Sequence, residues 1–144
     1  MLVYNPARQL WIGERYGCDT WQFPQGGVKA DTDLKGNVVR EVCEELGLER
    51  RHLGAIEQLQ ATHRYDFLHT PARWKHRWRG QEQTFWTVEF LGQDQDIRLD
   101  RHHPQEFSRW SWCPPQQVLQ KVEPIRRPGY VQPLEEFIAR FVNC

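Results

Sequence analysis

The feature that most constrains this chain is a helical pattern between residues 34 and 46. An apolar residue recurs at every fourth position, as on one stripe of an α-helix: Leu34, Val38, Val42 and Leu46. Gly47 follows the stripe directly, and glycine is the usual residue at which a helix ends. We predict that Thr32 is the N-cap and that Asp33 lies in the first turn, where its charge favours the helix dipole.

Three carboxylates lie beside this stripe rather than opposite it. At about 100° per residue, Glu41, Glu44 and Glu45 fall within roughly a quarter turn of one another. Like charges at this spacing cost a helix a few tenths of a kcal/mol per pair, and a bound divalent cation would relieve the repulsion. Mg²⁺ prefers oxygen ligands of this kind. From spacing alone, a metal site and an ordinary solvated face both stay open.

The remainder of the chain predicts one mixed α/β (α+β) domain over residues 1–144, with a sheet between helices. MLVYN and LWIGERY read as the two strands of a hairpin, and residues 21–24 as a short extended piece. Periodicity predicts further strands and helices. The strands are at 56–65, 84–91 and 107–112, and the helices are at 116–121 and after Pro128.

Composition excludes several classes of protein. Lys plus Arg and Asp plus Glu are both 19, so the net charge gives no reason to expect tight, nonspecific nucleic-acid binding. The 4 cysteines form no CxxC pair, which argues against a zinc site and a disulfide framework. No apolar run approaches the roughly 20 residues of a membrane span. The first residues lack the pattern of a signal peptide, so we expect a cytoplasmic protein with no membrane partner.

A basic strip at residues 69–79, HTPARWKHRWR, lies in a long predicted loop. Together with the separate acidic cluster, it suits a metal ion and an anionic substrate. A solvated loop is the plain alternative. A second alternative is an RNA-associated interaction domain that stacks bases on Trp74 and Trp78, which would bind single strands without Mg²⁺.

Residues 26–48, GGVKADTDLKGNVVREVCEELGL, resemble the Nudix box, G-x5-E-x7-R-E-U-x-E-E-x-G-U, where U is aliphatic. All but one of its positions match at the required spacing: Gly26, Arg40, Glu41, Val42, Glu44, Glu45, Gly47 and Leu48. The departure is Thr32, where the box has Glu. In the family that Glu supports the box arginine, here Arg40, and either neighbour, Asp31 or Asp33, is a candidate to replace it.

Four further segments resemble one branch of the family, the bacterial RNA 5′-pyrophosphohydrolases and related dinucleoside-polyphosphate hydrolases. They are WQFPQGG (21–27), RGQEQTFW (79–86), PQEFSRWSW (104–112) and EPIRRPGY (123–130). Family members usually have several more residues before the first strand, including a basic residue that contacts phosphate, whereas Met1 here begins inside the strand. The resemblance implies a Nudix fold, with a mixed sheet sandwiched between helices.

The resemblance also implies the site. Its metal ligands would be Glu41, Glu44, Glu45, Glu106 and Gly26, holding Mg²⁺ or alternatively Mn²⁺. Its catalytic residues would be Glu41, Glu45 and Glu106, with Glu106 or Glu41 taking a proton from water. Its substrate-binding residues would be Arg15, which stacks on a base, Arg126, which contacts phosphate, and Tyr65 and Gln83. Ile125 replaces the family's frequent Phe as the second stacking partner.

The expected function is Mg²⁺-dependent hydrolysis of a phosphoanhydride bond in a nucleoside polyphosphate. The expected substrates are the 5′-triphosphate end of RNA and a dinucleoside polyphosphate, and free (d)NTPs stay open. The alternative is a catalytically weak Nudix-fold module that binds nucleotide or RNA, for which Thr32 is the main support. The resemblance further suggests a homodimer.

Overall fold

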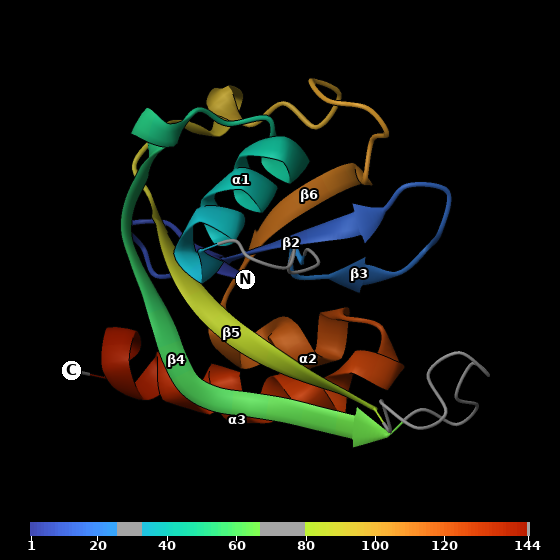
Figure 1. The fold of residues 1–144 in the computed structure, drawn as a ribbon, viewed down its shortest axis with the longest axis vertical. Coiled ribbons are helices and arrows are strands. Elements are labelled where there is room, and N and C mark those ends of the chain that lie inside the picture. Colours follow the sequence, from blue (N-terminus) through green and yellow to red (C-terminus); the bar gives the residue numbers. More distant parts are fainter. Residues whose placement is uncertain (26–32, 67–79, 144) are drawn as a thin grey trace.

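A computed structural model describes residues 1–25, 33–66 and 80–143 (Figure 1). Its centre is a mixed sheet with the order β3-β2-β1-β5-β4, and β6 pairs with β2. The strands are β1 (Leu2–Tyr4), β2 (Leu10–Arg15), β3 (Trp21–Gln22), β4 (Leu53–Asp66), β5 (Gly80–Phe90) and β6 (Phe107–Cys113). The predicted hairpin of β1 and β2 is confirmed, and the strands predicted at 56–65 and 84–91 each begin a few residues earlier.

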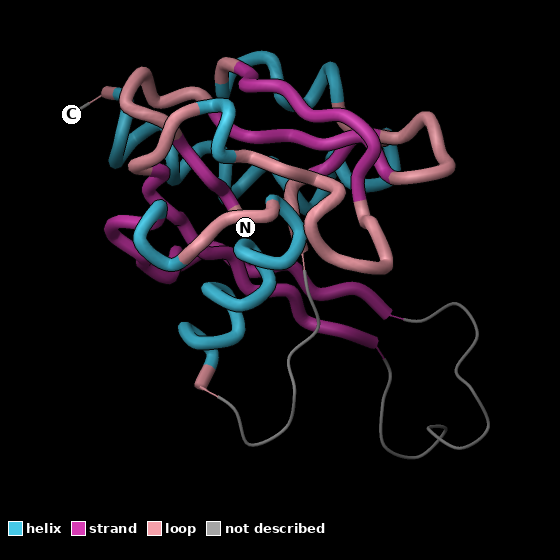
Figure 2. Tube along the Cα trace, turned by 90° about the horizontal axis from the view of Figure 1, so that it is seen from above, coloured by secondary structure: helices cyan, strands magenta, loops and turns pink. Residues whose placement is uncertain are grey.

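The pairing of β1 with β5 is parallel, and the other pairings are antiparallel. β4 and β5 are long and run side by side to a shared end, where Asp66 pairs with Gly80 (Figure 2). β1 pairs with β5 only at residues 87–89. The hairpin of β4 and β5 therefore extends well beyond its contact with β1.

Helices cover both faces of the sheet, as predicted. They are α1 (Leu34–Leu46), α2 (Val118–Lys121) and α3 (Arg127–Phe137), and α3 continues as a π-helical turn over Ile138–Val142. Figure 1 shows α1 on one side of β2 and β6, with α2 and α3 on the other. Short 3₁₀ segments lie at Arg50–His52, Asp94–Asp96, Pro115–Gln117 and Pro124–Arg126. The helix predicted over 116–121 is therefore a 3₁₀ turn followed by α2.

Each face of the sheet has its own apolar layer. The α1 layer contains Val3, Trp11, Val42, Leu46 and Phe107. The layer under α2 and α3 contains Leu2, Ile12, Phe23, Leu134 and Phe137. Alternate residues of β1 and β2 thus enter opposite layers, as the two-residue period of a strand requires. No helix in the described ranges is long and apolar enough to cross a membrane.

The ends of α1 correct one prediction. The N-cap is Asp33, whose side chain accepts a hydrogen bond from Gly36 N–H at 3.1 Å, and not Thr32, which lies outside the described residues. Gly47 ends the helix as predicted, with φ 68° in the left-handed region. A Cβ at Gly47 would meet the backbone carbonyl oxygen of Arg98, so two independent constraints favour glycine there.

A carboxylate of α3 also fastens that helix to the sheet. The register of β4 against β5 shifts between Gln58 and Thr62. Glu136 accepts the backbone N–H groups of Gln60 and Ala61 in this irregular stretch, at 3.0 and 2.9 Å. The side chain therefore satisfies backbone donors that a regular strand pairing would use.

Candidate active site

The three box carboxylates differ sharply in their exposure. Glu45 is buried, with 4% of its surface exposed. The side chain of Glu41 is 18% exposed and that of Glu44 is 47% exposed. Oε2 of Glu45 has no hydrogen-bond partner among the described residues. A buried carboxylate oxygen without a donor is costly, so this oxygen marks Glu45 as a candidate ligand for a cation.

The surroundings of Glu45 favour its protonated form. Burial raises the pKa of Glu45 to about 8. The charge of the Met1 amino group lowers this pKa, and so does a hydrogen bond from the backbone N–H of Gln25. The carboxylates of Glu41 and Glu106 raise it further. The carboxylate pair predicted from distant segments, Glu45 and Glu106, therefore lies close enough in space to interact electrostatically.

Arg40 lies between two of the box carboxylates. Its Nη1 is 3.0 Å from Glu41 Oε1 and 3.6 Å from Glu44 Oε1. Its Nη2 donates to Oδ1 of Asn37 at 3.0 Å. Burial raises the pKa of Glu41, and Arg40 is the largest influence that lowers it again. Arg40 thus offsets the repulsion that spacing predicted for Glu41 and Glu44.

Asn37 was missed by the sequence reasoning, although its spacing of three residues from Arg40 could have indicated a contact. It is buried, which fixes the guanidinium from the helix side. Asp33 was predicted as a support for Arg40. Its observed hydrogen bond is the helix cap, and a role toward Arg40 stays a prediction.

Glu106 and Arg15 form an ion pair with each other. Arg15 Nη1 lies 3.0 Å from Glu106 Oε2, and both side chains are 38% exposed. The backbone N–H of Tyr16 donates to the carbonyl oxygen of Glu106 at 2.9 Å, which holds the two segments together. The two residues were predicted for separate roles, in base stacking and at the metal, and their mutual contact was not foreseen.

Arg126 reaches the same region through Gln25. Its Nη1 donates to Gln25 Oε1 at 3.1 Å, and its Nε donates to Glu123 Oε2 at 3.2 Å. Since the backbone of Gln25 also contacts Glu45, one residue links the predicted phosphate ligand to the buried carboxylate. The neighbouring Ile125 is 80% exposed, and it is therefore available to a ligand.

The remaining predicted site residues stay predictions. Gly26 and Asp31 lie outside the described residues, as does the basic strip at 69–79. Tyr65 pairs with Gln81 in the β4–β5 hairpin, and only its backbone is described. Gln83 pairs with His63 nearby and is partly buried. Contact of Tyr65 and Gln83 with substrate is therefore still an expectation from the resemblance.

The predicted metal ligands do not form a ready cluster. In the described part of the chain, no three His, Cys, Asp or Glu side chains are grouped closely enough to hold a metal ion. Three of the four predicted carboxylate ligands are instead in ion pairs, Glu41 and Glu44 with Arg40 and Glu106 with Arg15. The chemistry of the donors nevertheless fits a hard divalent cation, since Glu45 presents an unpartnered buried oxygen near two other carboxylates.

Comparison with known proteins identifies the family of this chain. Residues 1–133 match the family described as NUDIX domain. A protein of Dinoroseobacter shibae named RNA pyrophosphohydrolase is 33% identical over 141 residues, covering 95% of this chain and 88% of the relative. A protein of Methylococcus capsulatus with the same name is 34% identical over 141 residues, covering 94% of this chain and 72% of the relative.

Solved structures share the fold. A NUDIX hydrolase of Listeria monocytogenes superposes with a TM-score of 0.67 at 19% identity, covering 99% of this chain and 92% of that one. An Ap4A hydrolase of C. elegans superposes with a TM-score of 0.63 at 16% identity, covering 97% and 96%. At these identities the likeness concerns the fold alone. The box helix, the mixed sheet between helices and the match over residues 1–133 lead to one conclusion, that the chain belongs to the Nudix family.

Proposed function

We propose that this chain is a Mg²⁺-dependent hydrolase that splits a phosphoanhydride bond at the 5′-triphosphate end of RNA. The observation that carries the proposal is the buried Glu45 carboxylate on the box helix, whose Oε2 has no hydrogen-bond partner among the described residues, with Glu41 and Glu106 beside it. The family generally uses divalent metals. The choice of RNA ends over other polyphosphates rests on relatives that bear the name RNA pyrophosphohydrolase over nearly the whole chain.

Glu45, Glu41 and Glu106 would hold the metal, and Glu44 would join them after leaving Arg40. When bound, a divalent ion neutralises phosphate charge and makes a coordinated water more acidic. Glu106 or Glu41 would take the proton of the attacking water. The water oxygen forms a new bond to phosphorus, the P–O bond to the leaving phosphate breaks, and that phosphate departs with the electron pair.

Two arginines would position the substrate. Arg126 would contact phosphate oxygens, for which a guanidinium is well suited. Arg15 would stack on the first base, and to do so it must part from Glu106, which is then available to the metal. Substrate binding and the assembly of the carboxylates would therefore be coupled through one ion pair.

We also propose a cytoplasmic location and a homodimer. Three cysteines of the described residues, Cys18, Cys43 and Cys113, are free thiols, as a reducing compartment would keep them. The dimer rests on analogy with the family, and light scattering coupled to size-exclusion chromatography would measure it.

The test is a turnover assay with MgCl₂ on three substrates: 5′-triphosphorylated RNA, diadenosine tetraphosphate and dATP. We expect the RNA to be the best substrate and pyrophosphate or phosphate to be released. Glu45→Gln should lose most of the activity, whereas Glu135→Gln, an exposed Glu of α3, should keep it. Full activity of Glu45→Gln would overturn the site assignment, and binding of RNA without turnover would favour a binding module.

A further inference from the structure

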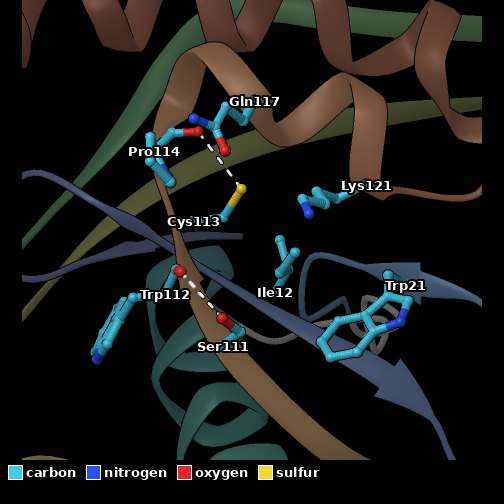
Figure 3. A pocket seen from close by; sticks show the side chains of 8 residues that line it. All are labelled: Ile12, Trp21, Ser111, Trp112, Cys113, Pro114, Gln117 and Lys121. Carbon is cyan, nitrogen blue, oxygen red and sulfur yellow. Dashed lines mark hydrogen bonds between the residues drawn. The ribbon is translucent and has the colours of Figure 1, made fainter.

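A pocket of about 400 Å³ lies on the face of the sheet that α2 and α3 cover, since its lining residues Ile12 and Cys113 belong to that layer. Its lining includes Ile12, Trp21, Ser111, Cys113, Gln117 and Lys121. Figure 3 shows the side chains of Ser111 and Cys113 on one side of β6 and the indole of Trp112 turned away on the other. The volume is within the range of small-molecule sites, and none of the proposed catalytic residues lines the pocket.

The sheet forms the floor of this pocket. Ile12 pairs with Ser111, and Leu10 pairs with Cys113, so that adjacent strands place these side chains on one face. Ile12 and Cys113 are buried in the α2–α3 layer. Gln117 and Lys121, from the segment that includes α2, form the other wall and are both exposed. The pocket thus has an apolar floor and a polar, solvent-accessible rim.

The indole ring of Trp21 lines one end of the pocket. Trp21 pairs with Glu14 in the sheet, and its side chain lies near the Glu14 carboxylate. The guanidinium of Arg109 lies over the Trp21 ring, 5.6 Å from its centroid, and is held by Glu14 at 2.7 Å. Arg109 covers one face of the ring and helps to fix its orientation, and since Trp21 also lines the pocket, a flat ligand would stack on the face that Arg109 leaves uncovered.

Lys121 supplies a positive charge at the rim. In the described ranges, no carboxylate lies within ion-pair distance of Lys121, so its ammonium is available to an anion. Arg109 also lies near Trp21, but its charge is offset by the Glu14 carboxylate at 2.7 Å and by the nearby Asp19, so Lys121 is the cation that the pocket offers. The Gln117 amide offers both a donor and an acceptor, as the edge of a nucleobase requires.

We propose that this pocket binds a mononucleotide, with the base stacked on Trp21, its edge at Gln117 and its phosphate at Lys121. Stacking of a base on an aromatic side chain is sequence-tolerant, and a Lys ammonium is a common phosphate ligand. The proposal goes beyond the hydrolase function and does not depend on it, because no group of the pocket belongs to the α1 carboxylates.

The test is calorimetric titration of the full chain with AMP and with adenosine, in EDTA so that no metal can bridge phosphate to the carboxylates. AMP should bind about tenfold more tightly than adenosine, and Lys121→Gln should abolish this difference. Ser111→Trp, which fills the pocket from an exposed position, should remove binding of both ligands. Lys35→Gln, an exposed lysine on α1, is the matched control and should bind AMP as the wild type does.

A further variant guards against misfolding of Ser111→Trp. Gln117→Glu places a negative charge near the proposed phosphate position, at an exposed residue. This variant should weaken the binding of AMP more than the binding of adenosine. Absence of saturable AMP binding, or an unchanged AMP-to-adenosine ratio in Lys121→Gln, would overturn the proposal. Loss of AMP binding in Arg126→Gln alone would assign it to the carboxylate site instead. Turnover is not measured, so these outcomes are independent of the proposed hydrolysis.

Discussion

Arg15 and Glu106 form an ion pair at 3.0 Å between the end of β2 and the residue before β6. Each is a predicted functional residue, and in this ion pair the charge of each side chain is neutralised by the other. Since both are 38% exposed, the pair itself contributes only about 0–1 kcal/mol. A contact this weak is readily exchanged for substrate or metal.

Substitution of Arg15 by Met should free Glu106. We expect the Mg²⁺ concentration for half-maximal activity to fall by up to about fivefold, since the released pair is worth up to about 1 kcal/mol. KM for RNA should rise, because the stacking group is lost. Magnesium titrations of activity measure both effects. Arg51→Met, which breaks the exposed pair with Glu49, is the control, and an unchanged magnesium midpoint in Arg15→Met would contradict the coupling.

Glu45→Gln should stabilise the metal-free protein. Its folded pKa, about 8, exceeds the ordinary value of 4.5, so Glu45 destabilises the fold increasingly as pH rises between these values. In EDTA at pH 8.5, the variant should melt several degrees above the wild type, corresponding to about 1–3 kcal/mol, and at pH 5 the two should nearly coincide. Thermal melts at both pH values provide the measurement.

Added MgCl₂ gives the complementary result. The ion should raise the Tm of the wild type, because it binds only the folded state, and it should raise that of Glu45→Gln much less. Equal magnesium shifts in the two proteins would place the metal elsewhere.

Glu136→Gln should loosen α3 from β4. Burial raises the pKa of Glu136, but the N–H groups of Gln60 and Ala61 together with Arg140 outweigh it and lower the pKa overall. The stabilisation is therefore present at neutral pH and is lost as pH falls through the depressed folded pKa. We expect a loss of about 1–3 kcal/mol at pH 7 that shrinks in acid, measured by urea unfolding. Glu135→Gln, its exposed neighbour, should change little.

Two glycines with positive φ provide a matched pair. Gly17 has φ +80° and open space where a Cβ would lie, so Gly17→Ala should cost about 1 kcal/mol from backbone strain alone. Gly47→Ala adds the clash with the Arg98 carbonyl oxygen and should cost at least about 2 kcal/mol more. Chemical unfolding of both variants measures the difference, and similar losses would mean that the α1 end can shift to make room.

The residues of α1 illustrate what local sequence can determine. Its apolar stripe, its end at Gly47 and its three carboxylates follow from a 3.6-residue period and were predicted without the tertiary structure. The cap was predicted one residue too early, because Thr32 and Asp33 are both good N-caps and only the backbone geometry distinguishes them. The segment resemblances likewise predict Glu106 and Arg126 as residues of the same site, and that assignment stays a prediction.

The tertiary structure decided which of these side chains are buried and which residues they contact. Periodicity places Glu44 and Glu45 side by side, yet only packing against the sheet buries Glu45 and leaves Glu44 exposed. The contacts of Arg15 with Glu106 and of Gln25 with Arg126 join residues 91 and 101 positions apart, which no local pattern encodes. The pocket beneath α2 depends on the register of β2 with β3 and β6. The sequence by itself determined the helix and the spacing of its carboxylates, whereas the burial and the partners of these side chains depended on long-range packing, because both arise between segments that are distant in the chain.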